Sequence, residues 1–172
     1  RRSLEVLKDP IWRHFWSIVS EHHGGSSKFP ACDEFLDSAV AIYQHLQSEL
    51  LAAEHIGHLE DLFAEDLWPI VRAAHSDFHP VRQQFGAENC KINWRATELA
   101  YVAALSSPKV EEEAKETKVL AGARIFSIMS MAFDPEEVRH SIDDLIFESA
   151  FDDTNGVENW RIVHISGPRT SE

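Results

Sequence analysis

The sequence predicts an all-α protein: a single-domain bundle of about six or seven helices with a short extended C-terminal tail. Five of its seven prolines stand at the start of an amphipathic run, namely Pro10, Pro30, Pro80, Pro108 and Pro135. Proline suits the first turn of a helix because its missing N–H would have no intrahelical partner there. Asp9, Ser107 and Asp134 precede three of these prolines and can cap the N–H groups that follow. Apolar residues also recur three or four positions apart along most of the chain, which is helical spacing.

The first helices are expected in the N-terminal half. One occupies residues 9–22 and ends where paired glycines and serines favour an open backbone. A longer helix is expected over residues 33–53, with a glycine shortly afterwards as its C-cap. Pro69 interrupts the next apolar run, which therefore forms either two short helices or one kinked helix. A short helix follows over residues 79–86.

Three further helices are expected in the C-terminal half. The first covers residues 93–105, and the third begins at Asp134-Pro135 with a capping-box-like arrangement. The second begins at Pro108 and has the most regular spacing, in steps of three and four: Val110, Ala114, Thr117, Ala121, Ile125, Ile128 and Ala132. Residues 160–165 are rich in aromatic and β-branched types, which favours an extended segment. Because one strand cannot make a sheet, this tail is expected to pack alone or to pair with a partner, and residues 166–172 are expected to fray.

Bulk composition limits the class of protein. A length of 172 residues suits one domain over 1–172, and Arg1 in place of an initiator Met suggests a fragment of a longer chain. The 29 acidic residues outnumber 16 basic ones, and a net charge of −13 argues against a broad nucleic-acid-binding face. This charge suits solubility, a basic protein partner or divalent cations, and selects none of these. Cys32 and Cys90 form no metal or redox motif, and the sequence shows no signal peptide or membrane span. An intracellular location, cytoplasmic or nuclear, is therefore expected.

The aromatic residues suggest a binding surface. Trp12 and Trp16 would lie one helical turn apart with Phe15 beside them, a wider apolar face than one buried stripe needs. Trp160 and Ile162 mark the extended tail as a second candidate. These residues predict a non-enzymatic protein–protein interaction module that binds a peptide or helix of a partner, of basic or amphipathic character. The other interpretation of the N-terminal aromatics is a broad core face on a central helix.

The alternative function is a helical metal-binding protein or metalloenzyme. His45 and Glu49 are four residues apart, as are His75 and His79, and each pair would project from one face of a helix. Histidine and carboxylate side chains at this spacing can bind one metal ion together. With ten histidines in the chain, such spacings also arise without any shared site.

Three other sequence patterns give weaker indications of a catalytic or metal-binding function. Asp143-Asp144 with Glu148 resembles an acidic magnesium motif, but an acidic solvated helix face explains it as well. Neither Cys32 nor Cys90 is tied to a histidine, and residues 24–28 lack the spacing of a phosphate loop. No catalytic constellation is visible, so a non-enzymatic role is favoured and no cofactor is expected. A small-molecule pocket between helices is a third possibility.

Overall fold

The computed structural model describes residues 8–85, 90–106, 117–131, 134–152, 156–166 and 169–170. Helices occupy the N-terminal half: α2 (Lys8–His22), α3 (Cys32–Ala52), α4 (Trp68–Asp77) and α5 (His79–Phe85), with the 3₁₀ turns η1 (Gly25–Ser27) and η2 (Gly57–Leu62). Strands occupy the rest: β1 (Cys90–Ser106), β2 (Thr117–Met131), β3 (Asp134–Asp152), β4 (Gly156–Ile165) and β5 (Arg169–Thr170). The described fold is thus mixed α/β, and the prediction of an all-α bundle of six or seven helices is wrong.

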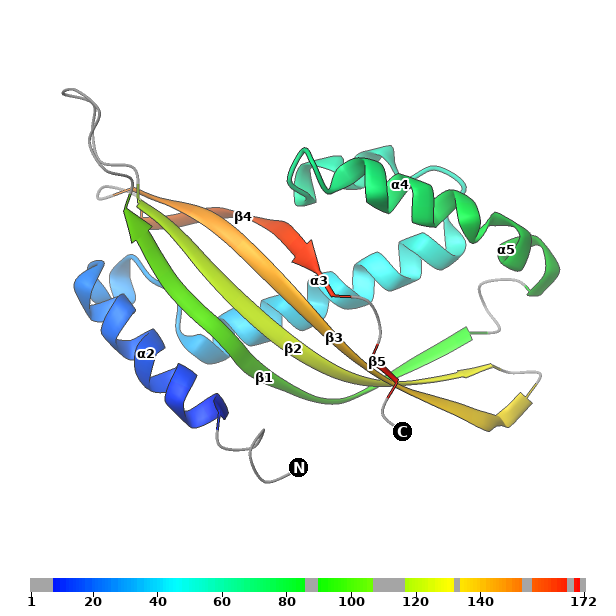
Figure 1. Cartoon of the computed structure of the whole chain (residues 1–172), viewed down its shortest axis with the longest axis horizontal. Coiled ribbons are helices and arrows are strands. Elements are labelled where there is room, and N and C mark those ends of the chain that lie inside the picture. Colours follow the sequence, from blue (N-terminus) through cyan, green and yellow to red (C-terminus); the bar gives the residue numbers. More distant parts are fainter. Residues whose placement is uncertain are drawn as a thin grey trace.

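The strands form one antiparallel sheet in the order β1-β2-β3-β4, with β5 pairing with β3. The first three strands are long and curved, and α3 crosses one face of the sheet (Figure 1). On that face, alternate residues of β2 and β3 are buried against the helices. The core therefore lies between the sheet and the N-terminal helices.

The helix predicted from Pro108 is strand β2 where the structure describes it, from Thr117 onwards; residues 107–116 lie outside the described part. The fully buried residues of β2 alternate: Val119, Ala121, Ala123 and Ile125. The predicted helical stripe paired Ala121 with Ile125, four positions on. Because four is an even step, these two residues also share one face of a strand, so their spacing fits a strand as well as a helix.

The helix predicted from Asp134-Pro135 is also wrong, because this segment begins β3. Proline is tolerated at a strand start, so Pro135 does not distinguish the two structures. Leu145 faces the core, whereas Ile142 and Ile146 lie on the outer face of the sheet. A strand with apolar residues on both faces reproduces the three- and four-residue spacing of a helix.

The two remaining C-terminal predictions are corrected in the same way. Residues 93–105, expected as a helix, lie in β1, which pairs with β2 along its length. Residues 160–165, expected as a tail, form most of β4, where Ile162 pairs with Phe147 of β3. In the segment expected to fray, Arg169–Thr170 form β5 beside Ser141 and Ile142.

Proline does mark helix starts in the N-terminal half. Pro10 lies in the first turn of α2, Pro80 is the second residue of α5, and Pro30 lies two residues before α3. Pro69 is the second residue of α4, and the apolar run around it forms two short helical segments, η2 and α4, and not one kinked helix. None of the helices in the described ranges is long and apolar enough to cross a membrane.

Phe35 of α3 joins the helices to the sheet. Its ring centroid lies 5.1 Å from that of Trp16, 5.6 Å from that of Phe147 and 5.3 Å from that of Trp160. The loop after η2 also attaches to the sheet, since the amide N–H of Ala64 donates to the carbonyl of Ile162 at 2.9 Å. These contacts fix the position of α3 relative to β3 and β4.

Candidate functional site

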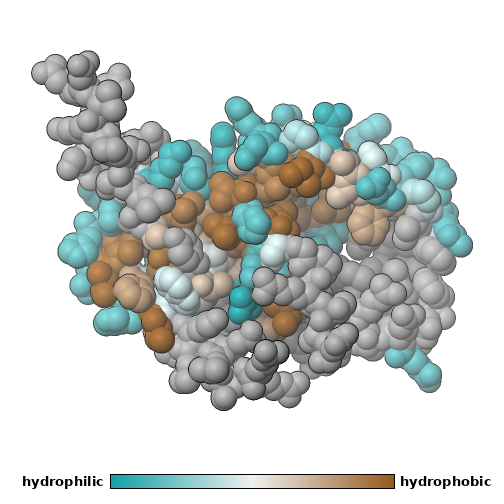
Figure 2. Space-filling view, in the orientation of Figure 1, coloured by the Kyte–Doolittle hydropathy of each residue, from teal (hydrophilic) through white to brown (hydrophobic). Residues whose placement is uncertain are grey.

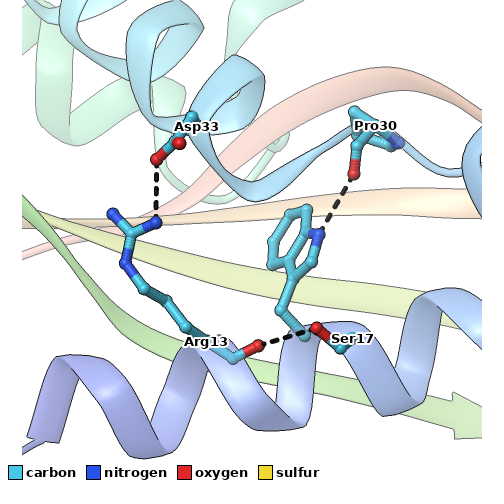
Figure 3. Close-up of polar contacts among 5 residues, drawn as sticks. Arg13, Ser17, Pro30 and Asp33 are labelled. Atoms are coloured by element: carbon cyan, nitrogen blue, oxygen red, sulfur yellow. Dashed lines mark hydrogen bonds and ion pairs between the residues drawn. The ribbon is translucent and has the colours of Figure 1, made fainter.

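Two of the predicted binding residues belong to the core. Trp16 is 3% exposed, and its indole N–H donates to the carbonyl oxygen of Pro30 at 3.1 Å (Figure 3). Ile162 is fully buried in β4. The structure therefore supports the core interpretation for Trp16, and it also buries Ile162, which was expected in an extended tail.

The remaining N-terminal aromatics, Trp12 and Phe15, differ in their exposure on α2. Arg13 of α2 forms an ion pair with Asp33 at the start of α3, with 2.8 Å between Nη1 and Oδ1 (Figure 3). Phe15 lies on an exposed stripe of α2 with Ile11 and Ile18. Trp12 is half-buried, and its ring lies 5.7 Å from that of Phe15. In the predicted groove, Phe15 thus lies on the solvent side of α2, whereas Trp12 and Trp16 pack against the core.

An aromatic pocket does occur at the edge of the sheet, between α3 and β4. We call it the α3–β4 pocket; its volume is about 160 Å³ and its lining residues are Pro30, Glu34, Phe35, Ser38, Ala39, Ile42, Phe147 and Trp160. Phe35 and Phe147 are buried, whereas Trp160 is half-buried. Of the five residues predicted to bind a partner, Trp160 is the one that lines this pocket. Ser38 is exposed on α3 and lines it as well.

Acidic side chains surround the start of α3 beside this pocket. Glu34 lines the pocket and is exposed, and Asp37 is exposed one turn further along the helix. The Glu34 carboxylate also accepts a hydrogen bond from the backbone N–H of Ala31 at 3.4 Å. Negative side chains stabilise a helix N-terminus, and here Glu34 also contributes an acidic group to the lining of the pocket.

Hydrophobic residues are also visible on the surface of the sheet near β4 (Figure 2). The outer face of β2 and β3 carries half-buried apolar side chains: Leu120, Phe126, Ile142 and Ile146. Between them, the Arg124 guanidinium donates two hydrogen bonds to the Asp144 carboxylate, at 2.8 and 3.2 Å. This face therefore combines apolar side chains with two ion pairs, Arg124–Asp144 and Lys118–Glu148.

Asp143 does not lie on a solvated helix face, as the acidic motif suggested. Its carboxylate is buried between β3 and α3, where it accepts a hydrogen bond from the hydroxyl of Tyr43. Burial, and next the hydrogen bond to Asp143, raise the pKa of Tyr43 well above its ordinary value, so this phenol stays protonated. Asp144 points to the opposite face of the same strand. Because neighbouring strand residues alternate, the two carboxylates cannot share a magnesium ion.

The candidate metal ligands are divided between two places. His45 and Glu49 of α3 lie together with His58 of η2, and the ligand atoms of all three lie within 4.8 Å of one another. His75 is buried in α4, where its Nε2 lies 2.7 Å from the carbonyl oxygen of Ala53. His79 begins α5, so the His75–His79 pair spans two helices. Sequence spacing could not find His58, because a turn separates it from α3.

His75 lines a second, more polar pocket between the end of α3 and α4. Its volume is about 400 Å³, and its lining residues are Glu54, His55, Ile56, Gly57, Glu60, Trp68, Arg72, His75 and Ser76. Acidic and basic side chains both contribute to this lining, so it does not favour a ligand of one charge.

Models of known protein families and curated protein sequences give no match to this chain. The function is therefore argued from the sites themselves. Among the predicted binding residues, Trp160 in the α3–β4 pocket combines an aromatic wall with open space for a ligand group.

Proposed function

We propose that this chain is a non-enzymatic protein–protein interaction module. Its α3–β4 pocket takes one large apolar side chain from a partner segment that also carries lysine or arginine. The observation that supports this proposal is the open pocket lined by Phe35, Phe147 and Trp160, next to the acidic start of α3.

The size and lining of the pocket favour an apolar group. An apolar cavity on the order of 150 Å³ is large enough for a benzene-sized molecule, and this pocket is about 160 Å³. A leucine, methionine or phenylalanine side chain has a comparable bulk. Tryptophan is enriched among the residues that dominate binding energy at protein interfaces, and Trp160 forms one wall.

Charge favours a basic segment around that apolar residue. Glu34 is exposed and lines the pocket, and the whole chain carries a net charge of −13. Complementary charge speeds association and selects against acidic partners. An intracellular compartment is part of this proposal.

The test is a panel of synthetic peptides, each with one leucine, methionine or phenylalanine between lysine and arginine residues. We expect binding to change the tryptophan fluorescence of the protein and to weaken as salt is raised. Ser38→Trp fills the pocket from an exposed position and should weaken binding at least tenfold. Ser48→Trp, at another exposed serine of α3 outside the pocket lining, is the matched control and should bind as the wild type does.

Two results would count against the proposal. One is a panel in which peptides with glutamate in place of the basic residues bind equally well. The other is a Ser38→Trp variant that keeps wild-type affinity while its circular dichroism spectrum shows an intact fold.

A further inference from the structure

We infer that His45, Glu49 and His58 form a binding site for a divalent transition-metal ion, with Zn²⁺ as the expected ion. His45 and Glu49 lie one turn apart near the C-terminal end of α3, and η2 brings His58 back against them. The Nε2 atom of His58 lies 3.0 Å from Oε2 of Glu49. This site is separate from the α3–β4 pocket and does not depend on the proposed interaction function.

Buried neighbours fix the backbone on both sides of the site. Leu46, next to His45, is 3% exposed. Ile56 and Leu59 enclose His58 in sequence and are buried as well. The backbone positions of the ligands are therefore held by the core, while the His45 and His58 rings themselves are exposed. Such an arrangement reduces the ordering that metal binding requires.

The distances suit coordination after a small adjustment. In a tetrahedral zinc site with bonds of about 2.0–2.1 Å, ligand atoms lie about 3.4 Å from one another. The three ligand atoms here lie within 4.8 Å of one another, and Glu49 and His58 are already closer than the tetrahedral separation. A change of rotamer at the exposed His45 ring can supply the remaining approach. Water would complete the coordination sphere, as it does in three-ligand zinc sites.

The ligand set selects a class of metal ion. Two imidazoles and one carboxylate suit Zn²⁺, Cu²⁺ or Ni²⁺, whereas Ca²⁺ and Mg²⁺ prefer oxygen ligands. Glu49 lies in the last turn of α3, where the helix dipole favours positive charge. Among the described residues, no other group of three histidine, cysteine or acidic side chains brings its ligand atoms this close.

Calorimetric titration of the untagged protein with Zn²⁺ tests the site. We expect one ion per chain with a micromolar or lower dissociation constant. His45→Ala and His58→Ala, both at exposed positions, should each weaken binding at least tenfold. His14→Ala, an exposed histidine on α2 outside the group, is the matched control and should leave binding unchanged.

A spectroscopic measurement separates a built site from weak surface binding. Co²⁺ in place of Zn²⁺ should give the intense visible absorption of a four-coordinate ion, and Glu49→Gln should abolish it while the circular dichroism spectrum stays unchanged. The proposal is overturned if the His45 and His58 variants bind Zn²⁺ as tightly as His14→Ala does. It is equally overturned if Co²⁺ shows only the weak absorption of the hydrated ion. Peptide binding in the α3–β4 pocket should be the same in all these variants.

Discussion

Replacing Gly156 with alanine is expected to lower the free energy of unfolding by about 2–4 kcal/mol. Gly156 begins β4 with φ of +80°, in the left-handed region that side chains disfavour. A Cβ atom here would overlap the carbonyl oxygen of Lys28 and lie 2.8 Å from the Lys28 Cα atom. The neighbouring amide N–H of Val157 donates to that same carbonyl at 2.9 Å, so the two backbones cannot separate without losing this bond.

Gly57→Ala provides the matched control. Gly57 has no positive φ, and a Cβ atom built there meets no atom within 4 Å. The free energy of unfolding of Gly57→Ala should differ from that of the wild type by no more than about 0.5 kcal/mol. Urea denaturation of both variants, followed by tryptophan fluorescence, measures the difference. Equal stability of the two variants would show that β4 does not approach Lys28 as closely as described.

Replacing Tyr43 with phenylalanine is expected to lower the free energy of unfolding by about 1–3 kcal/mol at pH 7. The substitution keeps the ring but removes the hydroxyl that donates to the buried Asp143 carboxylate. Removing a donor from a buried charged acceptor costs more than removing one at the surface. Ser17→Ala, which removes an exposed hydroxyl from α2, is the control and should change stability by less than about 0.5 kcal/mol.

The stability difference should also depend on pH. Because burial and Asp143 raise the pKa of Tyr43, the folded protein keeps the phenolic proton above the ordinary tyrosine pKa of about 10, where the unfolded chain releases it. The stabilisation by Tyr43 is therefore complete below about pH 10 and is lost as pH rises further. Denaturation curves at pH 7 and pH 10.5 should show the wild type losing more stability than Tyr43→Phe. A constant difference across this range would contradict the buried pair.

The candidate sites show which spatial neighbours a sequence pattern can predict and which it cannot. His45 and Glu49 were identified because one helical turn brings them together, and they do lie together on α3. His58 completes the group through the chain reversal at η2, which no spacing rule describes. Trp160 was identified by its residue type alone. Its pocket partners Phe35 and Phe147 come from α3 and β3, and only the packing of three elements brings them together.

The sequence by itself determined the acidic character of the chain and the helices of the N-terminal half. The backbone hydrogen bonds of a helix join residues four positions apart, so local sequence signals can predict where a helix lies. Such signals here are Pro10, Pro80 and the apolar stripe over residues 33–53. The C-terminal half was decided by tertiary structure. The apolar spacing around Ile125 and Ile142 fits a helix and a strand equally well. The strand conformation is stabilised by pairings such as that of Thr117 with Phe151, which join residues distant in the sequence. The same pairings place Asp143 inside the core and Asp144 outside it.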